Sequence, residues 1–229
     1  MKKIEFKLFL IFTLSILLNA CSLNIFNQQS EIDPALLPVQ TKRPATYVYE
    51  CQNGYEITVN IEGRMAWLFL REGTLGLPKI SSASGTKYSD GQNIFWSKGN
   101  TAMLETGTAV YKNCINNPGK AIWEHAKLKG ADFRAVGNEP GWHLEIMHDK
   151  KLIFTRNYGG ISHTFSTTQQ TTDQATRTTV YTAQEKEHTL SVTILGISCQ
   201  DTMSDDTYES TVTIVLNEKS FKGCGKSLH

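Results

Sequence analysis

The stretch between Thr46 and Cys114 alternates short apolar runs with glycine-containing dipeptides, and this pattern narrows the possible folds more than any other feature. From residue 55 to residue 62, apolar side chains occupy every second position, which is the period of a half-buried strand. The next runs, MAWLFL, NIFWSK, TAMLET and AVYKNC, are separated by Glu-Gly, Asp-Gly, Gly-Asn and Thr-Gly, which are typical of hairpin turns. Residues 46–116 are therefore expected to form a small antiparallel β-barrel.

A short helix is expected to follow the barrel. Asn117 can cap the first turn, Pro118 suits the first helical position, and Gly130 can end the helix. Residues 117–130 are therefore predicted to be a helical connector between two domains.

Residues 131–229 again show strand and turn patterns, which predict a second, mainly β domain. The threonine-rich stretch from Thr164 to Thr182 could be a low-complexity linker, but threonine suits exposed strand faces and we favour a hairpin. The fold class is all-β: a small antiparallel barrel and a second β domain, joined by the helical connector.

The N-terminal segment has the layout of an export signal. Three lysines precede an apolar run of about eleven residues, which is shorter than the roughly 20 residues that a membrane span needs. The run ends at Leu18-Asn19-Ala20-Cys21, which resembles the bacterial lipoprotein box. We expect residues 1–20 to be a signal peptide and residues 21–45 a tether lipidated on Cys21. The alternative is an ordinary secretory signal with an incidental cysteine.

The chain has five cysteines, and lipidation of Cys21 would leave an even number that can pair. Four cysteines allow three pairings. We expect Cys51 to join Cys114 and Cys199 to join Cys224, because each pair brackets a continuous run of strand signals, and an oxidising envelope favours disulfides. A metal site is the competing interpretation, but no two of these cysteines have the short ligand spacing of zinc ribbons.

Composition and motifs argue against several classes of function. The formal net charge is +1 and no basic run occurs, so nothing indicates a nucleic acid as partner. The sequence lacks the G-x-S-x-G and H-E-x-x-H motifs of hydrolases. The histidines are scattered without a motif around them: His125, His143, His148, His163, His188 and His229. We expect no enzymatic activity, no cofactor and no metal ion.

Two short motifs in the barrel region carry a resemblance to a known family. An S-G-x-x-Y motif lies in SASGTKYSDG (82–91), and a W-x-K-G motif lies in IFWSKGNTAMLE (94–105). Both stand between the first two cysteines of the predicted barrel. With these motifs, about a third of the chain resembles the membrane-bound and periplasmic inhibitors of c-type lysozyme.

The resemblance implies a small β-barrel whose two motif loops enter the active-site cleft of lysozyme. Lys98 would face the two carboxyl groups with which lysozyme cuts peptidoglycan, and Ser84 would add a neighbouring hydrogen bond. The matching loop residues are Ser84, Gly85, Tyr88, Lys98 and Gly99. Phe95 and Trp96 are expected to pack in or against the barrel.

The sequence thus predicts a lipoprotein inhibitor of c-type lysozyme that protects peptidoglycan against host defence. We expect it in the envelope of a Gram-negative bacterium, lipid-anchored and facing the periplasm, with Ser22 favouring the outer membrane. The alternative is a structural or envelope-binding lipoprotein without inhibitory activity. The sequence sets no oligomeric state.

The second domain resembles an uncharacterised domain of bacterial envelope lipoproteins, through FRAVGNEPGWHLEI (133–146), CQDTMSDDTY (199–208) and FKGCG (221–225). That resemblance implies no activity. Asp201, Asp205 and Asp206 suggest calcium, but they lack the alternating ligands of a calcium loop, so we expect a solvated turn. Residues 139–142 are expected to form a turn with Trp142 in the core, although a ligand contact through Trp142 is the alternative.

Overall fold

The structure is a computed structural model that describes residues 46–166 and 168–229. The predicted signal peptide, the lipidation site Cys21 and the tether lie outside the described residues. None of the helices in the described part of the chain has the length and apolar character needed to cross a membrane.

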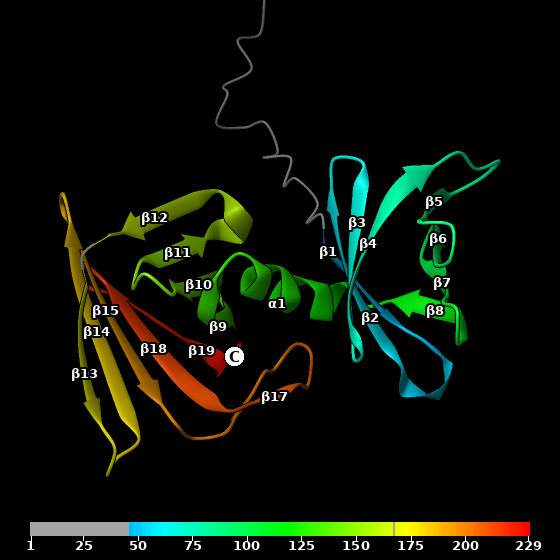
Figure 1. The fold of residues 1–229 in the computed structure, drawn as a ribbon. Coiled ribbons are helices and arrows are strands. Elements are labelled where there is room, and N and C mark those ends of the chain that lie inside the picture. The colour runs from blue at the N-terminus through cyan, green and yellow to red at the C-terminus, as the bar shows by residue number, and fades with distance from the viewer. Residues whose placement is uncertain (1–45, 167) are drawn as a thin grey trace, which may run out of the picture. The chain divides into compact units, whose positions relative to one another are not determined.

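The first body is a closed antiparallel barrel, which confirms the predicted fold (Figure 1). Each strand pairs with the next in sequence, and β1 pairs with β8 to close the barrel. The strands are β1 (Thr46–Glu50), β2 (Glu56–Glu62), β3 (Met65–Leu70), β4 (Gly73–Ile80), β5 (Thr86–Ser89), β6 (Ile94–Lys98), β7 (Thr101–Glu105) and β8 (Val110–Asn116), with a single 3-10 turn, η2 (Gln52–Gly54), between β1 and β2.

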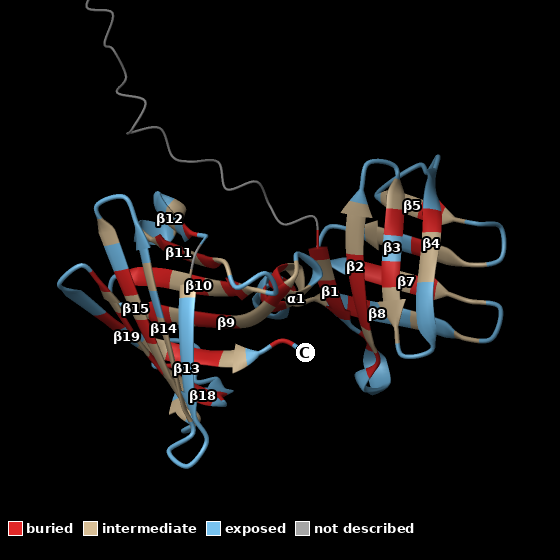
Figure 2. Ribbon diagram, turned by 60° about the vertical axis from the view of Figure 1, so that its left-hand side comes forward, coloured by how far each residue is buried: buried red, intermediate tan, exposed pale blue. Residues whose placement is uncertain are grey.

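The barrel interior is filled by the side chains that alternate along its strands. Ile57, Val59 and Leu68 are fully buried there, and Phe95 is 1% exposed. Figure 2 shows buried stretches of the barrel strands as red bands, with exposed turns between strands in pale blue. The predicted alternation between residues 55 and 62 is confirmed, and Thr58 is the exception because it is buried on the outer side.

Two strands, β4 and β5, were not anticipated. β4 contains two glycines and Pro78, which lower the strand signal of the sequence. Pro78 is tolerated because β4 pairs with β5 only through Lys79 and Ile80, so the missing N–H faces a stretch without a ladder on that side. β5 is only four residues long and lies inside a segment whose glycines and serines indicate turns.

The connector is an α-helix, α1 (Pro118–Leu128), as predicted. The side chain of Asn117 accepts a hydrogen bond from the backbone N–H of Lys120 at 3.0 Å, and Pro118 is the first helical residue. Beyond the helix, Gly130 has a φ of +86°, a conformation that favours glycine. The start and the end of the helix are therefore those that the sequence predicts.

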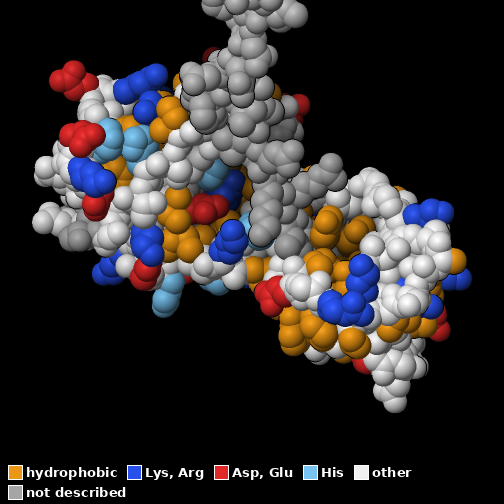
Figure 3. Space-filling view, turned by 90° about the horizontal axis from the view of Figure 1, so that it is seen from above, with side chains coloured by type: hydrophobic (Ala, Val, Ile, Leu, Met, Phe, Trp, Pro, Cys, Tyr) orange, Lys and Arg blue, Asp and Glu red, His pale blue; other side chains and the backbone are white. Residues whose placement is uncertain are grey.

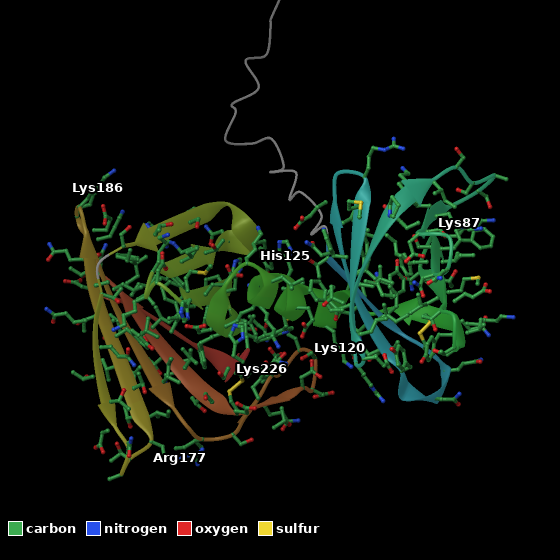
Figure 4. The ribbon with its side chains drawn as sticks, in the orientation of Figure 1. Lys87, Lys120, His125, Arg177, Lys186 and Lys226 are labelled. Carbon is green, nitrogen blue, oxygen red and sulfur yellow. A yellow bond between two sulfur atoms is a disulfide. The ribbon has the colours of Figure 1, made fainter. Side chains whose placement is uncertain are left out.

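Helix α1 covers the outer face of β1 and β2. Lys120 Nζ lies 2.6 Å from Glu50 Oε1 and 2.6 Å from Glu56 Oε2, and these contacts raise the pKa of Lys120. One turn and a half further on, His125 Nδ1 lies 2.8 Å from Thr46 Oγ1; Figure 4 labels Lys120 and His125 along the helix. This cover explains why outward-facing residues of the barrel, such as Thr58, are buried.

The second body is a nine-stranded antiparallel sheet, as expected for a mainly β domain. Its spatial order is β12-β11-β10-β9-β19-β18-β15-β14-β13, so the last strand of the chain lies between β9 and β18. The strands are β9 (Ala131–Asn138), β10 (Gly141–Met147), β11 (Leu152–Arg156), β12 (Ile161–Phe165), β13 (Thr168–Asp173), β14 (Thr178–Glu185), β15 (His188–Leu195), β18 (Ser210–Leu216) and β19 (Lys219–Ser227), with η3 (Asn157–Gly159) between β11 and β12.

One face of this sheet encloses an apolar core and the other packs partly against α1. The core includes Trp142, Phe154, Phe165 and Phe221. Trp123 of the helix packs on the opposite side with Tyr208 and Cys224. The sheet is nearly closed: the ring centroids of His163 on β12 and His188 on β15 are 4.5 Å apart.

The threonine-rich stretch forms a hairpin, as predicted, with β13 paired to β14 from Thr168–Ala183 to Asp173–Thr178. Disulfide bonds join Cys51 to Cys114 and Cys199 to Cys224, which are the expected pairs. The barrel and the second sheet have separate clusters of buried side chains. The division into two domains, residues 46–116 and residues 131–229, remains a prediction.

Candidate functional site

The two motif segments lie next to each other because β5 and β6 are paired. The ladder between them begins at Thr86 and Ser97, directly beside the loop of residues 81–85 and the last residue of β6. The loop precedes β5, and a tight turn follows β6, so both project from the same end of this strand pair. The resemblance predicted two loops acting together, and the strand pairing supplies a physical reason for their proximity.

The first loop is held in shape by its glycine. Gly85 has a φ of +68°, and a Cβ atom at this position would lie 2.4 Å from the carbonyl oxygen of Ser97. Ser82 Oγ donates a hydrogen bond to the carbonyl oxygen of Gly85 at 3.1 Å. A side chain at residue 85 would therefore push the loop away from β6.

Trp96, in the second motif, is hydrogen-bonded to the first loop. Its indole Nε1 donates a hydrogen bond to the carbonyl oxygen of Ser84 at 2.9 Å. Phe95, the preceding residue, points into the barrel core, and Trp96 lies on the outer face with 37% of its surface exposed. Both residues pack in or against the barrel as predicted, but the hydrogen bond to Ser84 was not foreseen, because residue spacing does not reveal which carbonyl an indole reaches.

The second loop is a two-residue hairpin between Lys98 and Thr101. Gly99 has a φ of +59° at the first central position, and Asn100 has no positive φ, which is the pattern of a type II′ turn. Thr101 Oγ1 donates a hydrogen bond to the carbonyl oxygen of Lys98 at 3.0 Å. The backbone around Lys98 is therefore well defined although its side chain is exposed.

Ser84 and Lys98 are both exposed, in contrast to Tyr88. Within the described residues, no salt bridge involves Lys98, so its ammonium group is available to an external anion. Tyr88 is 4% exposed and lies near Phe95 in the core, with ring centroids 6.3 Å apart. Of the predicted loop residues, Tyr88 thus supports the loops from inside the barrel and does not project from them.

A pocket of about 450 Å³ opens beneath the two loops, lined by Tyr47, Tyr49, Tyr88, Gly85, Ser97 and Gly99. Burial raises the pKa of the Tyr49 hydroxyl, and a hydrogen bond with Ser97 opposes this shift. Burial also raises the pKa of Tyr88, so the hydroxyl groups of Tyr49 and Tyr88 stay protonated at neutral pH and can donate hydrogen bonds. The mouth of the barrel is therefore polar but uncharged.

On the outer face, a shallow hollow of about 310 Å³ lies beside the second loop, with Trp96, Lys98, Met103 and Lys112 among its lining residues. Figure 3 shows lysine and arginine side chains beside hydrophobic ones on the barrel. Such a mixture of exposed aromatic and basic groups can bind an apolar surface that carries carboxylates.

The other sequence predictions concern metals and catalysis. In residues 46–166 and 168–229, no group of three or more His, Cys, Asp or Glu side chains is arranged to hold a metal ion. Asp201, Asp205 and Asp206 belong to a turn, as expected, but Asp201 is only 7% exposed, so the prediction that this turn is solvated is wrong for its first residue. Trp142 is 4% exposed and belongs to the core as predicted.

Comparison with known proteins gives matches in the barrel region. Residues 49–113 match the family described as membrane-bound lysozyme-inhibitor of c-type lysozyme. A protein of that name from Yersinia enterocolitica is 40% identical over 77 residues, which are 33% of this chain and 64% of the relative. A Pseudomonas aeruginosa protein of the same name is 35% identical over 83 residues, or 34% of this chain and 65% of the relative.

The chain therefore spans a little less than two thirds of these relatives. The segment that matches the family, residues 49–113, contains both motifs. The resemblance seen in the sequence is confirmed for residues 49–113. No solved structure matches the chain.

Proposed function

We propose that this protein inhibits c-type lysozyme and that the loops carrying Ser84 and Lys98 enter the active-site cleft of the enzyme. The observation that carries the proposal is the fixed pairing of two exposed loops, in which Trp96 and Gly85 hold the first loop against the second. The names of the Yersinia and Pseudomonas relatives supply the partner.

The proposed mechanism is a charge pair in a dry cleft. Lysozyme hydrolyses peptidoglycan with two carboxyl groups, one of which has a pKa raised to about 6 by its apolar setting. An ammonium group placed between them forms charge-assisted hydrogen bonds and occupies the position of the scissile bond. Lys98 suits this role because it is exposed, makes no salt bridge within the described residues, and stands on a hairpin whose backbone is fixed.

We further propose that the chain is a lipoprotein anchored through Cys21 in the bacterial envelope, in the outer membrane and facing the periplasm. Both relatives are named membrane-bound. An anchored inhibitor would meet lysozyme where it reaches the peptidoglycan. Metabolic labelling with a fatty acid, in wild type and in Cys21→Ser, tests this anchor: label that persists in the variant would contradict it.

The test of inhibition is the hydrolysis of a peptidoglycan suspension by c-type lysozyme. Wild type should suppress hydrolysis, and Lys98→Met should weaken binding by about thirty-fold to several thousand-fold, because it leaves buried carboxylates without their cation. Lys87→Met is the matched control, since Lys87 is a neighbouring lysine opposite Trp96 and should change affinity little. Failure of wild type to inhibit would favour a structural or envelope-binding role.

The charge pair also predicts a pH dependence. Lys98 favours the ionised form of the catalytic acid of lysozyme, so binding must release a proton whenever the pH lies below the free pKa of that acid, about 6. Affinity should therefore fall as the pH drops from about 6 towards 4. Titration calorimetry should show this slope for wild type and a nearly flat profile for Lys98→Met; equal slopes would contradict the proposed contact.

A further inference from the structure

The second sheet contains a pocket of about 610 Å³ at the place where the hydrogen-bonded ladder between β9 and β19 ends. The ladder between these strands ends at Val136 and Cys224, although β9 continues to Asn138 and β19 begins at Lys219. The pocket is lined by residues 136–139, 199–202 and 220–224, with Thr211. Three segments singled out by the sequence thus meet at a single site, and inhibition through the barrel loops does not involve them.

The floor of the pocket is built from two glycines on a buried indole. A Cβ atom at Gly137 would lie 2.4 Å from Cε2 of Trp142, and one at Gly223 would lie 2.7 Å from Cζ2 of the same ring. Only glycine therefore lets both strands rest on Trp142, which is 4% exposed. Residues 199–202 form one wall of the pocket, and the disulfide between Cys199 and Cys224 joins this wall covalently to β19. The pocket is thus a rigid part of the fold.

The most informative group in this pocket is the carboxylate of Asp201, which is 7% exposed. Its Oδ1 accepts hydrogen bonds from Asn138 Nδ2 at 2.9 Å, Met203 N at 2.7 Å and Ser204 N at 3.1 Å. Within the described residues, no hydrogen bond or salt bridge involves Oδ2. One oxygen therefore closes the turn, and the other remains for a donor from outside.

Asp201 is charged at neutral pH. Burial acts to raise its pKa, but the hydrogen bonds from Met203, Asn138 and Ser204 outweigh it, so the pKa lies below its ordinary value. An ionised carboxylate only accepts hydrogen bonds, so the free Oδ2 requires a ligand that donates one. A buried negative charge favours a donor that is itself cationic.

The pocket also contains groups of both signs at its rim. Lys222 and Glu139 line it with exposed side chains. Among residues 46–166 and 168–229, Lys222 forms no salt bridge. A pocket with an inner carboxylate and a free ammonium group at its rim matches a small ligand that carries both charges.

We propose that this pocket binds a small zwitterionic ligand, an amino acid or short peptide with free ends, whose ammonium group donates to Asp201 Oδ2 and whose carboxylate pairs with Lys222. The turn itself needs only Oδ1, so a structural role does not account for the second oxygen, which has no hydrogen-bond partner among the described residues. The proposal is independent of lysozyme inhibition.

NMR titration of the full chain with the dipeptide Ala-Ala tests the proposal. The amide signals of Gln200, Thr202 and Gly223 should shift on binding. Asp201→Asn keeps an oxygen for the three turn donors and removes the charge, so it should lower affinity about tenfold or more. Asp205→Asn, in the same turn but outside the pocket lining, is the matched control and should bind like wild type.

Two blocked dipeptides test the ammonium group and the carboxylate of the ligand one at a time. N-acetyl-Ala-Ala lacks the ammonium group, so it should bind weakly to wild type, and Asp201→Asn should reduce its affinity little further. Ala-Ala amide lacks the carboxylate, so it should bind weakly to wild type, and Lys222→Met should reduce its affinity little further. Retained protection of the Met203 and Ser204 amides from hydrogen exchange in Asp201→Asn would show that the turn is intact. The proposal is overturned if millimolar dipeptide shifts none of the pocket signals, or if Asp201→Asn binds as tightly as wild type.

Discussion

The barrel and the nine-stranded sheet use the same antiparallel pairing, but they offer binding groups in different ways. In the barrel every strand is hydrogen-bonded on both sides, so the proposed binding groups, Ser84 and Lys98, lie in turns at the end of paired strands. The second sheet is not closed by hydrogen bonds, and its pocket lies beside Asp201, where the ladder between β9 and β19 ends.

This difference matters for the electrostatics of the two regions. Lys98 is exposed to solvent, so its charge costs little in the free protein, and in the proposed mechanism it is paired only in the complex. Arg134 and Asp201 are 6% and 7% exposed, and their charges must be balanced inside the fold. The barrel loops are thus expected to tolerate charge changes, whereas the second sheet is expected to lose stability.

The largest effect is expected at Arg134, whose guanidinium group is paired with Glu145 and stacks at 5.7 Å over Trp123. Arg134→Met should lower the free energy of unfolding of the second sheet by about 3 to 5 kcal/mol, because it leaves the Glu145 carboxylate without its cation. Hydrogen exchange resolves the two regions and should show faster exchange in β9 and β10, with the barrel unchanged.

Lys151→Met is the matched control, because Lys151 forms an exposed pair with Asp149 at 3.1 Å and such pairs contribute little. If the two substitutions lowered the free energy of unfolding equally, or destabilised only the barrel, the expected difference in charge tolerance between the two regions would be contradicted.

The next effect is a loss of stability in acid. Burial, assisted by Arg134, lowers the pKa of His143 to about 4 from 6.5. Between these two pH values the unfolded chain takes up a proton that the folded sheet does not. The free energy of unfolding therefore decreases as the pH is lowered across this range, by on the order of 3 kcal/mol. His143→Gln should remove this part of the loss in denaturant titrations at pH 7 and pH 4. An unchanged difference in stability between the two pH values would contradict the expectation that the half-buried His143 stays neutral in the folded sheet.

A smaller effect is expected at Gly85 in the barrel. Gly85→Ala combines an unfavourable φ of +68° with a Cβ placed 2.4 Å from the Ser97 carbonyl oxygen, so we expect a cost of about 2 to 3 kcal/mol and weaker inhibition. Gly99→Ala has a similar φ of +59° but no atom within 4 Å of the added Cβ, and should cost about 1 kcal/mol. Thermal unfolding compares the stability losses of the two variants. A larger loss for Gly99→Ala than for Gly85→Ala would show that the contact with β6 does not hold the loop.

Local signals in the sequence predicted much of the fold. The cap, first residue and terminator of α1 were readable because Asn117, Pro118 and Gly130 act through their own backbone. β4 and β5 were missed because glycine, serine and proline indicate turns, and only pairing with neighbouring strands makes these segments extended. The position of β19 between β9 and β18 depends on contacts distant in sequence, which no local pattern contains.

The two sites were predictable to different degrees. A resemblance identified Ser84 and Lys98 in the barrel, but the bond from Trp96 to Ser84 depends on three-dimensional proximity. At Asp201 the sequence predicted the turn but not its burial, because Asn138 reaches it from another strand. Patterns of residue types therefore found the exposed loops more readily than the buried carboxylate.

The most direct test of the account is a hydrogen-exchange comparison of the protein alone and in complex with c-type lysozyme. Slower exchange on binding is predicted for residues 81–86 and 97–101, with no change in residues 131–229. The Lys98→Met variant should lose this protection at matched concentrations below saturation. Protection centred on the second sheet, or on barrel turns other than these two, would contradict the claim that the Ser84 and Lys98 loops bind the enzyme.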